Sequence, residues 1–532
     1  MTTYSKPSAQ RIHWTLPLFI SLFLAVFVLL ASFWTAPEDF SFFRIAPTID
    51  SSEETKEEIL RYIENKYVEE VDIELLRTMS VDSMLEYLDP HSVFIPGDEL
   101  QNIIEQMNGK FEGIGIEFIE LGDTFGITRV VEESPAHRAG LKVGDQIIGI
   151  NDTLFSSVDW DTEDRMKRFR GEGKTEVRLI LTLNKSQNSE VTITRGTVNV
   201  QTVPVYYMLD SITAFIKIDK FTGTTYNEFM TAIETMSKDH IVKNLILDLR
   251  SNPGGYLQQA VNILSQLFTE KGKLLVSTSG RKSKRTEYKS TGKNFYKMDE
   301  IAVLVDPQSA SASEIVAGTL QDLDRGVIIG QRTFGKGMVQ EQFQLKDGSG
   351  LRLTIAYYNL PSGRIIHDLG KGKSGIARNG SKFDNSIEFK THKGRTMMQG
   401  AGIEPDFTTA GYSFWKDTSE MYPTYAFQKT AFRYFVNNKN SVITAGNDYL
   451  KQLGKELLSN FKSEFNDYLT KEWTDEENFL AENQLIGSLI SLQKGMKEKY
   501  LFTNQSDESV LLAIQKIYEK DPLALKSLKA QN

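Results

Sequence analysis

Cysteine is absent from this chain of 532 residues. Its absence excludes disulfide bonds, a thiol nucleophile and a zinc site built on cysteine, and it leaves no N-terminal cysteine for lipid attachment. Histidine is scarce, with six residues, and no histidine has a spacing to serine and aspartate that by itself indicates a catalytic triad. Basic charge is not in excess either, since the net charge is -9. This balance argues against nucleic-acid binding, which requires a basic surface.

A long apolar run stands near the N-terminus, where Leu16 to Trp34 contains no charged residue. The run is long enough to cross a bilayer, and Lys6 and Arg11 precede it, which predicts that the N-terminus stays in the cytoplasm. A cleaved signal peptide is the alternative, but the run is longer than a typical signal-peptide core and Pro37 follows it closely. We therefore expect a retained signal anchor and a single-pass cell-membrane protein whose catalytic part is extracytoplasmic, in the periplasm.

The rest of the chain changes its hydrophobic period twice. Apolar residues recur at three- and four-residue spacings between residues 51 and 107, which is typical of helices. Short apolar runs separated by turn residues then predict a small β-rich domain, and alternating strands and helices predict an α/β core from about residue 198. We divide the chain into a signal anchor at 1–36, a helical region at 37–108, a β-rich domain at 109–196, an α/β core at 197–406 and a mainly helical C-terminal region at 407–532.

The strongest local signal is the segment Ser309 to Glu314, which follows the apolar run Ile301 to Val305 and precedes a helical pattern. A strand, a tight turn and a helix together form a geometry that suits a nucleophile. Ser311 and Glu314 fit the Ser-x-x-Glu capping box, which puts Ser311 at a helix N-terminus, where free N–H groups and the helix dipole favour negative charge. Ser311 is a candidate nucleophile, and a serine that only caps a helix is the alternative.

A base for this serine is offered by Lys336, which stands between two glycines and near few other charges. Burial without a carboxylate partner lowers the pKa of a lysine toward neutrality, so that its amine can accept a proton. Gln340 lies four residues further on, a spacing that returns to the same face of a strand or a helix, and we expect its amide to orient the amine. The alternative is a surface loop with a solvated lysine.

A third element is the run Asp248 to Gly255, which ends in Asn-Pro-Gly-Gly after an apolar strand. Glycines let backbone N–H groups approach a ligand closely. An oxyanion hole needs two such donors, and the N–H groups of Gly255 and Ala312 are the natural pair. A plain turn is the alternative.

In this order, the three elements resemble the carboxy-terminal processing peptidases, also called tail-specific proteases. The similarity extends over about residues 55 to 406 and includes Leu88-Asp89-Pro90-His91-Ser92, Gly318-Thr319-Leu320-Gln321-Asp322, the run from Thr333 to Gln340 and Gly402-Ile403-Glu404-Pro405-Asp406. The resemblance implies a crotonase-like fold in which Ser311 is the nucleophile, Lys336 the general base and Gln340 its orienting residue. Asp306-Pro307-Gln308 departs from the family pattern, which often has Asn followed by Gly there.

The β-rich domain is similar to a PDZ domain. Phe111 to Phe118 resembles the carboxylate-binding loop and the strand after it, and Ser134 to Ile147 matches a later PDZ signature. In such a domain, backbone N–H groups bind the terminal carboxylate of a peptide that adds to the sheet edge. We expect Gly113, Ile114, Gly115 and Ile116 to bind substrate tails, with Ile114, Ile116 and Phe118 lining an apolar pocket. A plain sheet module is the alternative.

These observations predict an α/β protein with a crotonase-like protease core, an inserted β-rich PDZ-type domain and helical regions at both ends. We expect a serine endopeptidase that recognises proteins with free apolar C-termini and needs no metal or organic cofactor. Two other readings are a catalytically silent PDZ scaffold and a crotonase-like enzyme that acts on thioesters. A homodimer and a regulatory adaptor are partners that the sequence leaves open.

Overall fold

The computed structural model describes residues 52–184, 187–367, 387–400, 402–411, 415, 423–438 and 447–519. All but the first few of these residues belong to one compact unit, Thr55–Asn532. The predicted signal anchor lies outside the described residues. Within the described ranges, no helix has both the length and the apolar character that a membrane span requires.

The α/β core contains a six-stranded sheet with the order β10-β11-β12-β15-β16-β21. Its strands are β10 (Val205–Met208), β11 (Thr213–Lys217), β12 (Asn244–Asp248), β15 (Glu300–Val305), β16 (Val327–Gly330) and β21 (Phe407–Thr408). All neighbouring strands are parallel except β10, which is antiparallel to β11. Every residue of β11 and β12 is buried, as expected for a parallel sheet that is covered on both faces.

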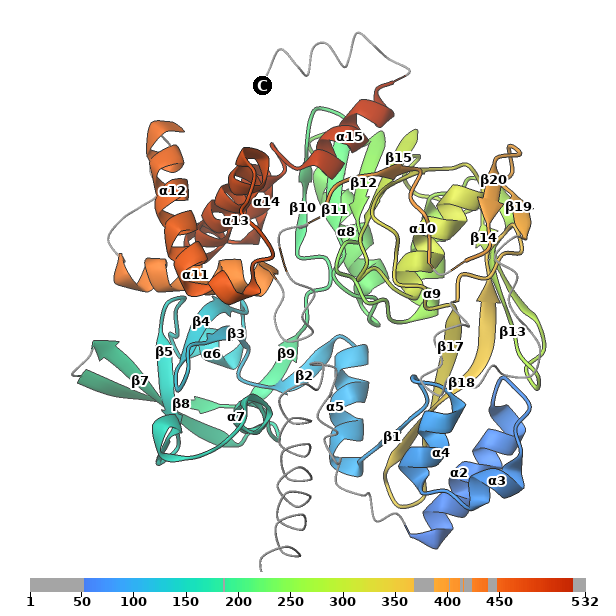
Figure 1. Cartoon of the computed structure of the whole chain (residues 1–532), viewed down its shortest axis with the longest axis horizontal. Coiled ribbons are helices and arrows are strands. Elements are labelled where there is room, and N and C mark those ends of the chain that lie inside the picture. The colour runs from blue at the N-terminus through green and yellow to red at the C-terminus, as the bar shows by residue number, and fades with distance from the viewer. Residues whose placement is uncertain are drawn as a thin grey trace, which may run out of the picture. The chain divides into compact units, whose positions relative to one another are not determined.

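Alternate residues of these strands point to the two faces of the sheet. The helices that cover it are α8 (Thr225–Ser237), α9 (Leu257–Gln266), α10 (Ala312–Asp322), α14 (Met496–Thr503) and α15 (Glu508–Ile517). Ile216 and Leu247 belong to the cluster with α8, α9 and α10, whereas Phe215 and Ile246 belong to the cluster with Val510 of α15. The C-terminal helix α15 therefore completes the core on one face (Figure 1).

A second, five-stranded sheet carries the segment after Lys336. It consists of β1 (Val93–Ile95), β13 (Lys271–Ser279), β14 (Thr286–Thr291), β17 (Met338–Gln344) and β18 (Gly350–Asn359). β18 pairs antiparallel with β17 on one edge, and with β1 and β13 on the other. A short hairpin of β19 (Glu388–Lys390) and β20 (Thr396–Met398) stands apart from both sheets.

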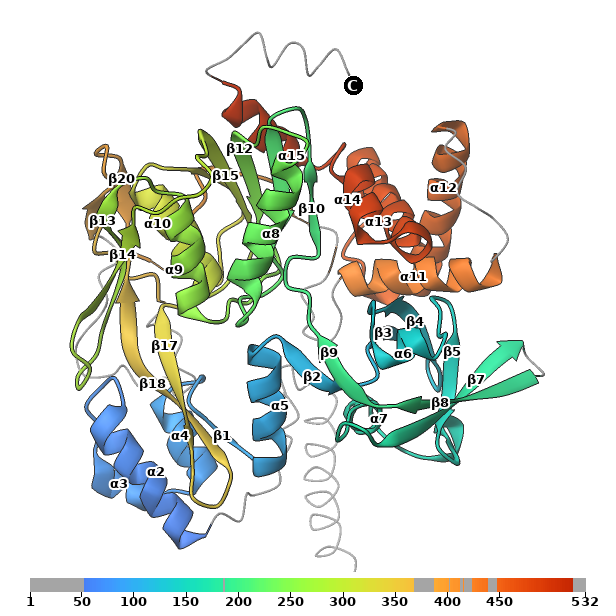
Figure 2. The same cartoon turned by 180° about the vertical axis from the view of Figure 1, so that it is seen from behind.

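The N-terminal helices pack against this second sheet. They are α2 (Glu53–Lys66), α3 (Ile73–Arg77), α4 (Val81–Leu88) and α5 (Gly97–Met107). Ile59 of α2 and Leu85 of α4 share a buried cluster with Leu351 and Leu353 of β18. Figure 2 shows α2 and α4 beside β17 and β18.

The PDZ-type domain forms a second six-stranded sheet, with β3 (Ile116–Glu120), β4 (Phe125–Val130), β5 (Gln146–Ile150), β7 (Glu176–Asn184) and β8 (Gln187–Thr194) in that order and β6 (Thr153–Leu154) beside β5. β2 (Lys110–Gly113) and β9 (Gly196–Asn199) form a separate two-stranded ribbon, and the helices are α6 (Pro135–Arg138) and α7 (Thr162–Phe169). Phe125, Phe155 and Phe169 lie in its buried cluster.

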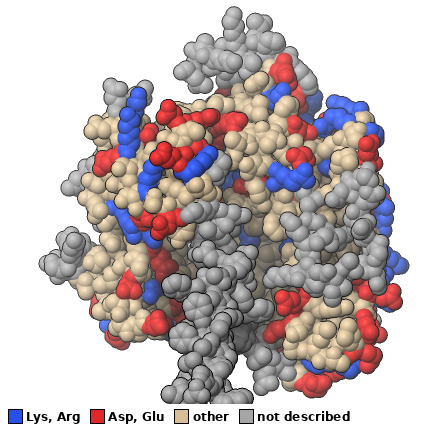
Figure 3. All heavy atoms as spheres, viewed as in Figure 1, with Lys and Arg blue, Asp and Glu red and all other residues tan. Residues whose placement is uncertain are grey.

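Three further helices, α11 (Pro423–Asn437), α12 (Asn447–Glu464) and α13 (Asp475–Lys494), share an aromatic-rich cluster. Ile119 of β3 belongs to the same cluster, so the PDZ-type domain is packed against these helices. The predicted α/β class with a PDZ-type domain and helical flanks is confirmed. The crotonase-like likeness and the domain boundaries stay predictions. On the face in Figure 3, basic and acidic side chains of the described residues are interspersed.

Candidate active site

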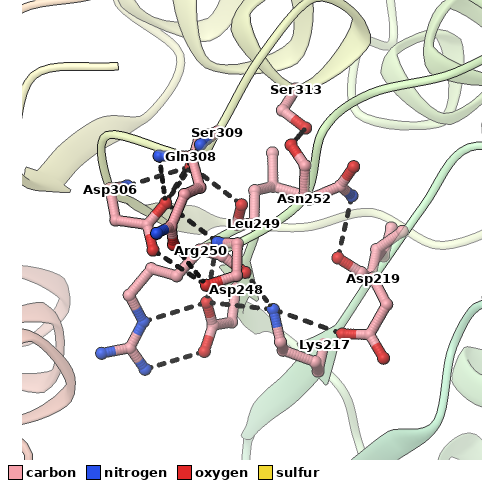
Figure 4. A network of polar contacts seen from close by, with 12 residues as sticks. Lys217, Asp219, Asp248, Leu249, Arg250, Asn252, Asp306, Gln308, Ser309 and Ser313 are labelled. Atoms are coloured by element: carbon pink, nitrogen blue, oxygen red, sulfur yellow. Dashed lines mark hydrogen bonds and ion pairs between the residues drawn. The ribbon is translucent and has the colours of Figure 1, made fainter. Parts of the chain in front are cut away.

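The segment Ser309 to Ser313 contains serines with two different environments. Ser309 and Ser313 are fully buried, and their hydroxyl groups each donate a hydrogen bond of 2.9 Å, to the carbonyl oxygens of Leu249 and Asn252 respectively (Figure 4). Ser311 is only partly buried. The outer serines thus fasten the turn to the neighbouring loop, and Ser311 is the serine of the three that is not fully buried.

Ser311 has a strained backbone at the start of α10. Its φ is 54°, a left-handed value that is unusual for a residue other than glycine, and such strain of roughly 1–3 kcal/mol is typical of functional sites. The peptide groups on either side are fixed, because the Ser311 N–H donates to Glu314 at 2.8 Å and the Ser311 carbonyl accepts from Ile315 N–H at 3.0 Å. The predicted position of Ser311 at a helix N-terminus is confirmed.

Glu314 connects this turn with the segment that carries Lys336. Its side chain is fully buried, and its carboxylate accepts hydrogen bonds from four donors. Oε2 accepts from the N–H groups of Ser311 and Lys336, and Oε1 accepts from Thr333 Oγ1 and Gly335 N–H. Burial raises the pKa of Glu314, and these donors act in the opposite direction. From the sequence, Glu314 was only a helix cap.

Lys336 lies in the loop between β16 and β17, and the hydroxyl of Tyr358 donates to the carbonyl oxygens of both Lys336 and Ser311. Burial is the largest effect on its amine and lowers the pKa of Lys336, and the positive charge of Arg352 lowers it further. The negative charges of Asp89 and Glu314 oppose this shift. The direction of this shift is the one that a lysine general base requires.

Gln340 lies on β17 opposite Thr354 of β18. Its Nε2 atom is buried and has no hydrogen-bond partner among the described residues. The predicted hydrogen bond between the Gln340 amide and the Lys336 amine is therefore not formed in this structure. Hydrogen bonds of catalytic groups are often long or misaligned without substrate.

The Asn-Pro-Gly-Gly loop packs directly against the serine turn. A Cβ atom on Gly254 would lie 2.8 Å from Ser311 Cβ and 2.9 Å from Ala312 N, so only glycine fits there. The Asn252 carbonyl accepts from Ala310 N–H at 3.0 Å, and Gly255 lies beside Phe221 with a φ of 142°. The structure thus brings the predicted oxyanion donors, Gly255 and Ala312, onto adjoining segments.

Asp306, which stands where the family pattern often has asparagine, still supports the serine turn. One carboxylate oxygen of Asp306 accepts from the N–H groups of Ser251, Gln308 and Ser309, at 2.9, 3.0 and 3.0 Å (Figure 4). Asp306 therefore holds the start of the serine turn against the segment that begins at Ser251 and leads into the Asn-Pro-Gly-Gly loop.

The N-terminal region adds two residues to the surroundings of Lys336. Asp89, which is 8% exposed, accepts from the N–H groups of His91 and Ser92 and from Thr354 Oγ1. Burial, together with the charge of Lys336, lowers the pKa of His91 to about 4. From the sequence alone, the Asp-Pro-His-Ser motif had no role beyond its resemblance to the family. Within the described residues, no three histidine, aspartate or glutamate side chains gather as a metal site would require.

In the PDZ-type domain, the carbonyl groups of the predicted tail loop point inward. The Ile114 carbonyl accepts from Ala136 N–H at 2.8 Å, and the Gly115 carbonyl accepts from Val131 N–H at 3.0 Å. Because the peptide bonds are trans, the N–H groups of Gly115 and Ile116 point in the opposite direction to these carbonyl groups.

The side chains of the tail loop have different surroundings from those expected. Ile114 is 2% exposed and packs in the domain core instead of lining an open pocket. Ile116 and Phe118 are partly buried, and Gly113 pairs with Gly196 of β9. At the far end of β3, the hydroxyl of Tyr425 from α11 accepts from Glu120 N–H at 3.2 Å.

Comparison with known proteins identifies both the α/β core and the PDZ-type domain. Residues 212–376 match the model of peptidase family S41, and residues 126–181 match that of the PDZ domain. A probable CtpA-like serine protease of Staphylococcus aureus (strain COL) is 32% identical over 373 residues, which cover 69% of this chain and 73% of the relative.

The carboxy-terminal processing protease CtpA of Bacillus subtilis (strain 168) is 32% identical over 333 residues, or 61% of this chain and 69% of the relative. A solved photosystem II D1 C-terminal processing protease is 24% identical, covers 69% of this chain and 95% of its own, and gives a TM-score of 0.40. The resemblance found in the sequence is therefore confirmed: the chain belongs to peptidase family S41 and is a serine-type protease with a PDZ domain.

Proposed function

We propose that this chain is an endopeptidase that cuts proteins through a serine–lysine dyad of Ser311 and Lys336. The observation that carries the proposal is the buried carboxylate of Glu314, which accepts from the backbone N–H groups of both residues at 2.8 and 2.9 Å. Two segments from different elements are thereby held together at the N-terminus of α10. The lowered pKa of Lys336 and the accessible position of Ser311 support the same roles.

The neutral amine of Lys336 removes the proton of Ser311 Oγ while that oxygen attacks the carbonyl carbon of the scissile peptide bond. The tetrahedral intermediate carries a negative oxygen, which the N–H groups of Gly255 and Ala312 stabilise. Cleavage of the C–N bond leaves an acyl-enzyme, and Lys336 returns the proton to the leaving amine. A water molecule, deprotonated by the same amine, then attacks the ester carbon; the C–Oγ bond breaks and Lys336 returns the proton to Ser311 Oγ.

Gln340 orients the lysine in this scheme. Its buried Nε2 donor has no partner among the described residues, and an unsatisfied buried donor costs about 1–3 kcal/mol. A neutral lysine amine has a lone pair that accepts this hydrogen bond, whereas an ammonium group has none. The amide of Gln340 therefore favours the neutral form of Lys336, which is the form that acts as a base.

The PDZ domain selects substrates by their C-terminal tails. The outward N–H groups of Gly115 and Ile116 bind the terminal carboxylate, and the tail extends along the edge of β3. The last side chain of the tail is apolar, because Ile116 and Phe118 offer it an apolar surface. A charged last residue would lose its hydration there without a partner.

An anchor at Leu16 to Trp34 holds the enzyme at the cell membrane, with the catalytic part on the extracytoplasmic side. Cell fractionation tests this proposal. The full chain is expected in the membrane fraction, and a chain that begins after Pro37 is expected outside it. Recovery of both chains in the same soluble fraction would contradict the anchor.

The endopeptidase proposal is tested with the full chain in detergent and one unfolded protein substrate that ends in a free apolar tail, an amidated tail or an aspartate. At substrate concentrations well below saturation, amidation or a terminal charge should lower kcat/KM about tenfold to a hundredfold, the usual effect of losing one charge-assisted hydrogen bond. The Ser311→Ala variant is the control and should cut none of them. Equal rates on the three tails would overturn the proposed selection of substrates by their C-terminal tails, and cleavage by the control would overturn the dyad.

A further inference from the structure

Arg250, two residues after the end of β12, lies at the centre of a network of buried charges. Its guanidinium donates to both carboxylate oxygens of Asp248, at 3.0 and 2.7 Å, and the Asp248 side chain is 1% exposed (Figure 4). Lys217 of β11 is also buried, and its amine donates to the Arg250 carbonyl oxygen. These contacts fix Arg250 from inside the core sheet.

The outer contact of Arg250 comes from the C-terminal region. Its NH1 group donates to Asp507 Oδ2 at 2.7 Å, across 257 positions of the chain. Asp507 is the N-cap of α15, where its other oxygen, Oδ1, accepts from Val510 N–H at 3.1 Å. One carboxylate therefore has two separable tasks, the helix cap on Oδ1 and the ion pair on Oδ2.

The backbone that follows Arg250 needs such support. Ser251 has a φ of 59°, which is strained for a serine, and Gly254 and Gly255 also have left-handed values of 94° and 142°. This turn ends against Ser311, with Gly254 in direct contact with the serine turn. A small movement of Arg250 would shift the N–H groups that face the reacting oxygen.

We propose that Asp507 is a positioning residue for peptide-bond cleavage, which acts by fixing Arg250 and with it the oxyanion loop 251–255. The C-terminal helix α15, outside the family match at residues 212–376, is thus part of the catalytic machinery. The inference rests on the proposed serine chemistry. The effect belongs in kcat and not in KM, because the oxyanion donors act on the transition state and the tail is bound by another domain.

The key variant is Asp507→Asn, because asparagine caps a helix as well as aspartate does, while its NH₂ group replaces the charged oxygen that accepts from Arg250. We expect kcat to fall about tenfold to a hundredfold, as for an ångström-scale displacement of catalytic groups, with KM within about twofold and Tm close to that of the parent chain. Asp507→Ala removes the cap as well and should lower Tm in addition. Glu519→Gln, an exposed carboxylate just beyond α15, is the matched control and should leave kcat unchanged.

A double-mutant cycle shows whether Asp507 acts through Arg250. Arg250→Lys keeps the positive charge but loses the pair of hydrogen bonds that the guanidinium makes to Asp248. The double variant Arg250→Lys, Asp507→Asn should have a kcat no lower than that of the slower single variant. Hydrogen exchange of the amides of Ser251, Asn252, Gly254 and Gly255 supplies a readout that does not depend on cleavage, and Asp507→Asn should speed it about tenfold.

A kcat within about twofold of the parent, a rise in KM alone, additive losses in the double variant or unchanged exchange at 251–255 would each overturn the positioning role. If Ser311→Ala still cuts substrate, the proposed dyad fails, and the exchange measurement still decides whether Asp507 holds the loop.

Discussion

The turn around Ser311 and the loop around Gly115 are the proposed sites for the scissile bond and for the substrate tail, and different contacts hold them in place. Carboxylates fix the serine turn: the buried Glu314 accepts from four donors, and the partly buried Asp306 accepts from three backbone N–H groups. Backbone carbonyls and close packing fix the tail loop, where a Cβ on Gly115 would lie 2.3 Å from Ser134 Cβ.

This difference separates the consequences of substitution. Removal of a charge from the serine turn leaves several buried donors without an acceptor, which disturbs the groups that perform the chemistry. Addition of atoms to the tail loop pushes it away from Ser134 and so changes how well a tail fits. We therefore expect substitutions in the first region to act on kcat and those in the second to act on KM.

The largest effects should come from the proposed dyad itself. Ser311→Ala and Lys336→Ala should each lower kcat by about 10⁴-fold or more, because residues that act as one unit lose nearly all activity singly. Lys336→Arg should be as damaging, since a guanidinium does not release its proton at any relevant pH. Tail-peptide affinity, measured by fluorescence polarisation, should stay unchanged in all three. A variant that keeps a tenth of the parent kcat would contradict the dyad.

Glu314→Gln should have the next largest effect. Glutamine offers one acceptor oxygen, so either the Ser311 and Lys336 amides or Thr333 Oγ1 and the Gly335 amide would face an NH₂ group. Two lost hydrogen bonds to a charge, at about 1.5–3 kcal/mol each, predict a fall of about a hundredfold in kcat and a lower Tm. Glu388→Gln, at an exposed carboxylate, is the control. An unchanged kcat would show that Glu314 does not align the two segments.

The sequence predicted the segments of this site better than their contacts. The serine turn, the lysine loop and the Asn-Pro-Gly-Gly loop were all recognisable, because each combines glycine or small residues with a strand or helix boundary. The second role of Glu314 was not, since its bonds to Gly335 and Lys336 depend on how two distant elements pack. Asp507 was missed for the same reason, because an aspartate before a helix reads only as a cap.

The same limit applies to the PDZ domain. The glycine pattern indicated the tail loop, but the burial of Ile114 depends on the cluster around it and not on local sequence. The α/β alternation indicated the core sheet, whereas nothing local showed that α15 would cover one of its faces. Long-range packing is the part of the fold that single-sequence patterns leave undetermined.

The tail loop can be tested with two glycines of one domain. Gly115 and Gly122 both have left-handed φ values, 85° and 71°, but a Cβ on Gly122 would meet nothing within 4 Å. Gly115→Ala should weaken tail binding about tenfold and raise KM accordingly, with kcat at saturation unchanged. Gly122→Ala carries a similar backbone strain of about 1 kcal/mol and should lower Tm slightly without an effect on KM. Equal KM values for the two variants would contradict the assigned loop.

The smallest expected effect is a change of kcat with pH. It distinguishes the surroundings of Lys336, which should set this dependence, from the tail loop, which should not. Burial and the charge of Arg352 lower the pKa of Lys336, and only the neutral amine is a base, so kcat should rise as pH increases through this lowered pKa and be lost as pH falls. His91 should add no step above about pH 6, because burial and the charge of Lys336 lower its pKa to about 4. Tail binding uses backbone groups and should not change over this range.

Arg352→Met removes the positive charge and keeps an apolar stem of similar length. Without that charge the pKa of Lys336 should rise, so the rising limb of the kcat profile should move to higher pH and kcat at pH 7.5 should fall by about threefold, a modest effect of one screened charge. Arg285→Met, at a 61% exposed arginine, is the control and should leave the profile in place. The profiles of kcat and of tail-peptide affinity are measured side by side from pH 6 to 10. A limb that stays in place or moves to lower pH would show that Arg352 does not tune the base, and a shift in tail affinity of the same size would show that the variant has altered the whole chain.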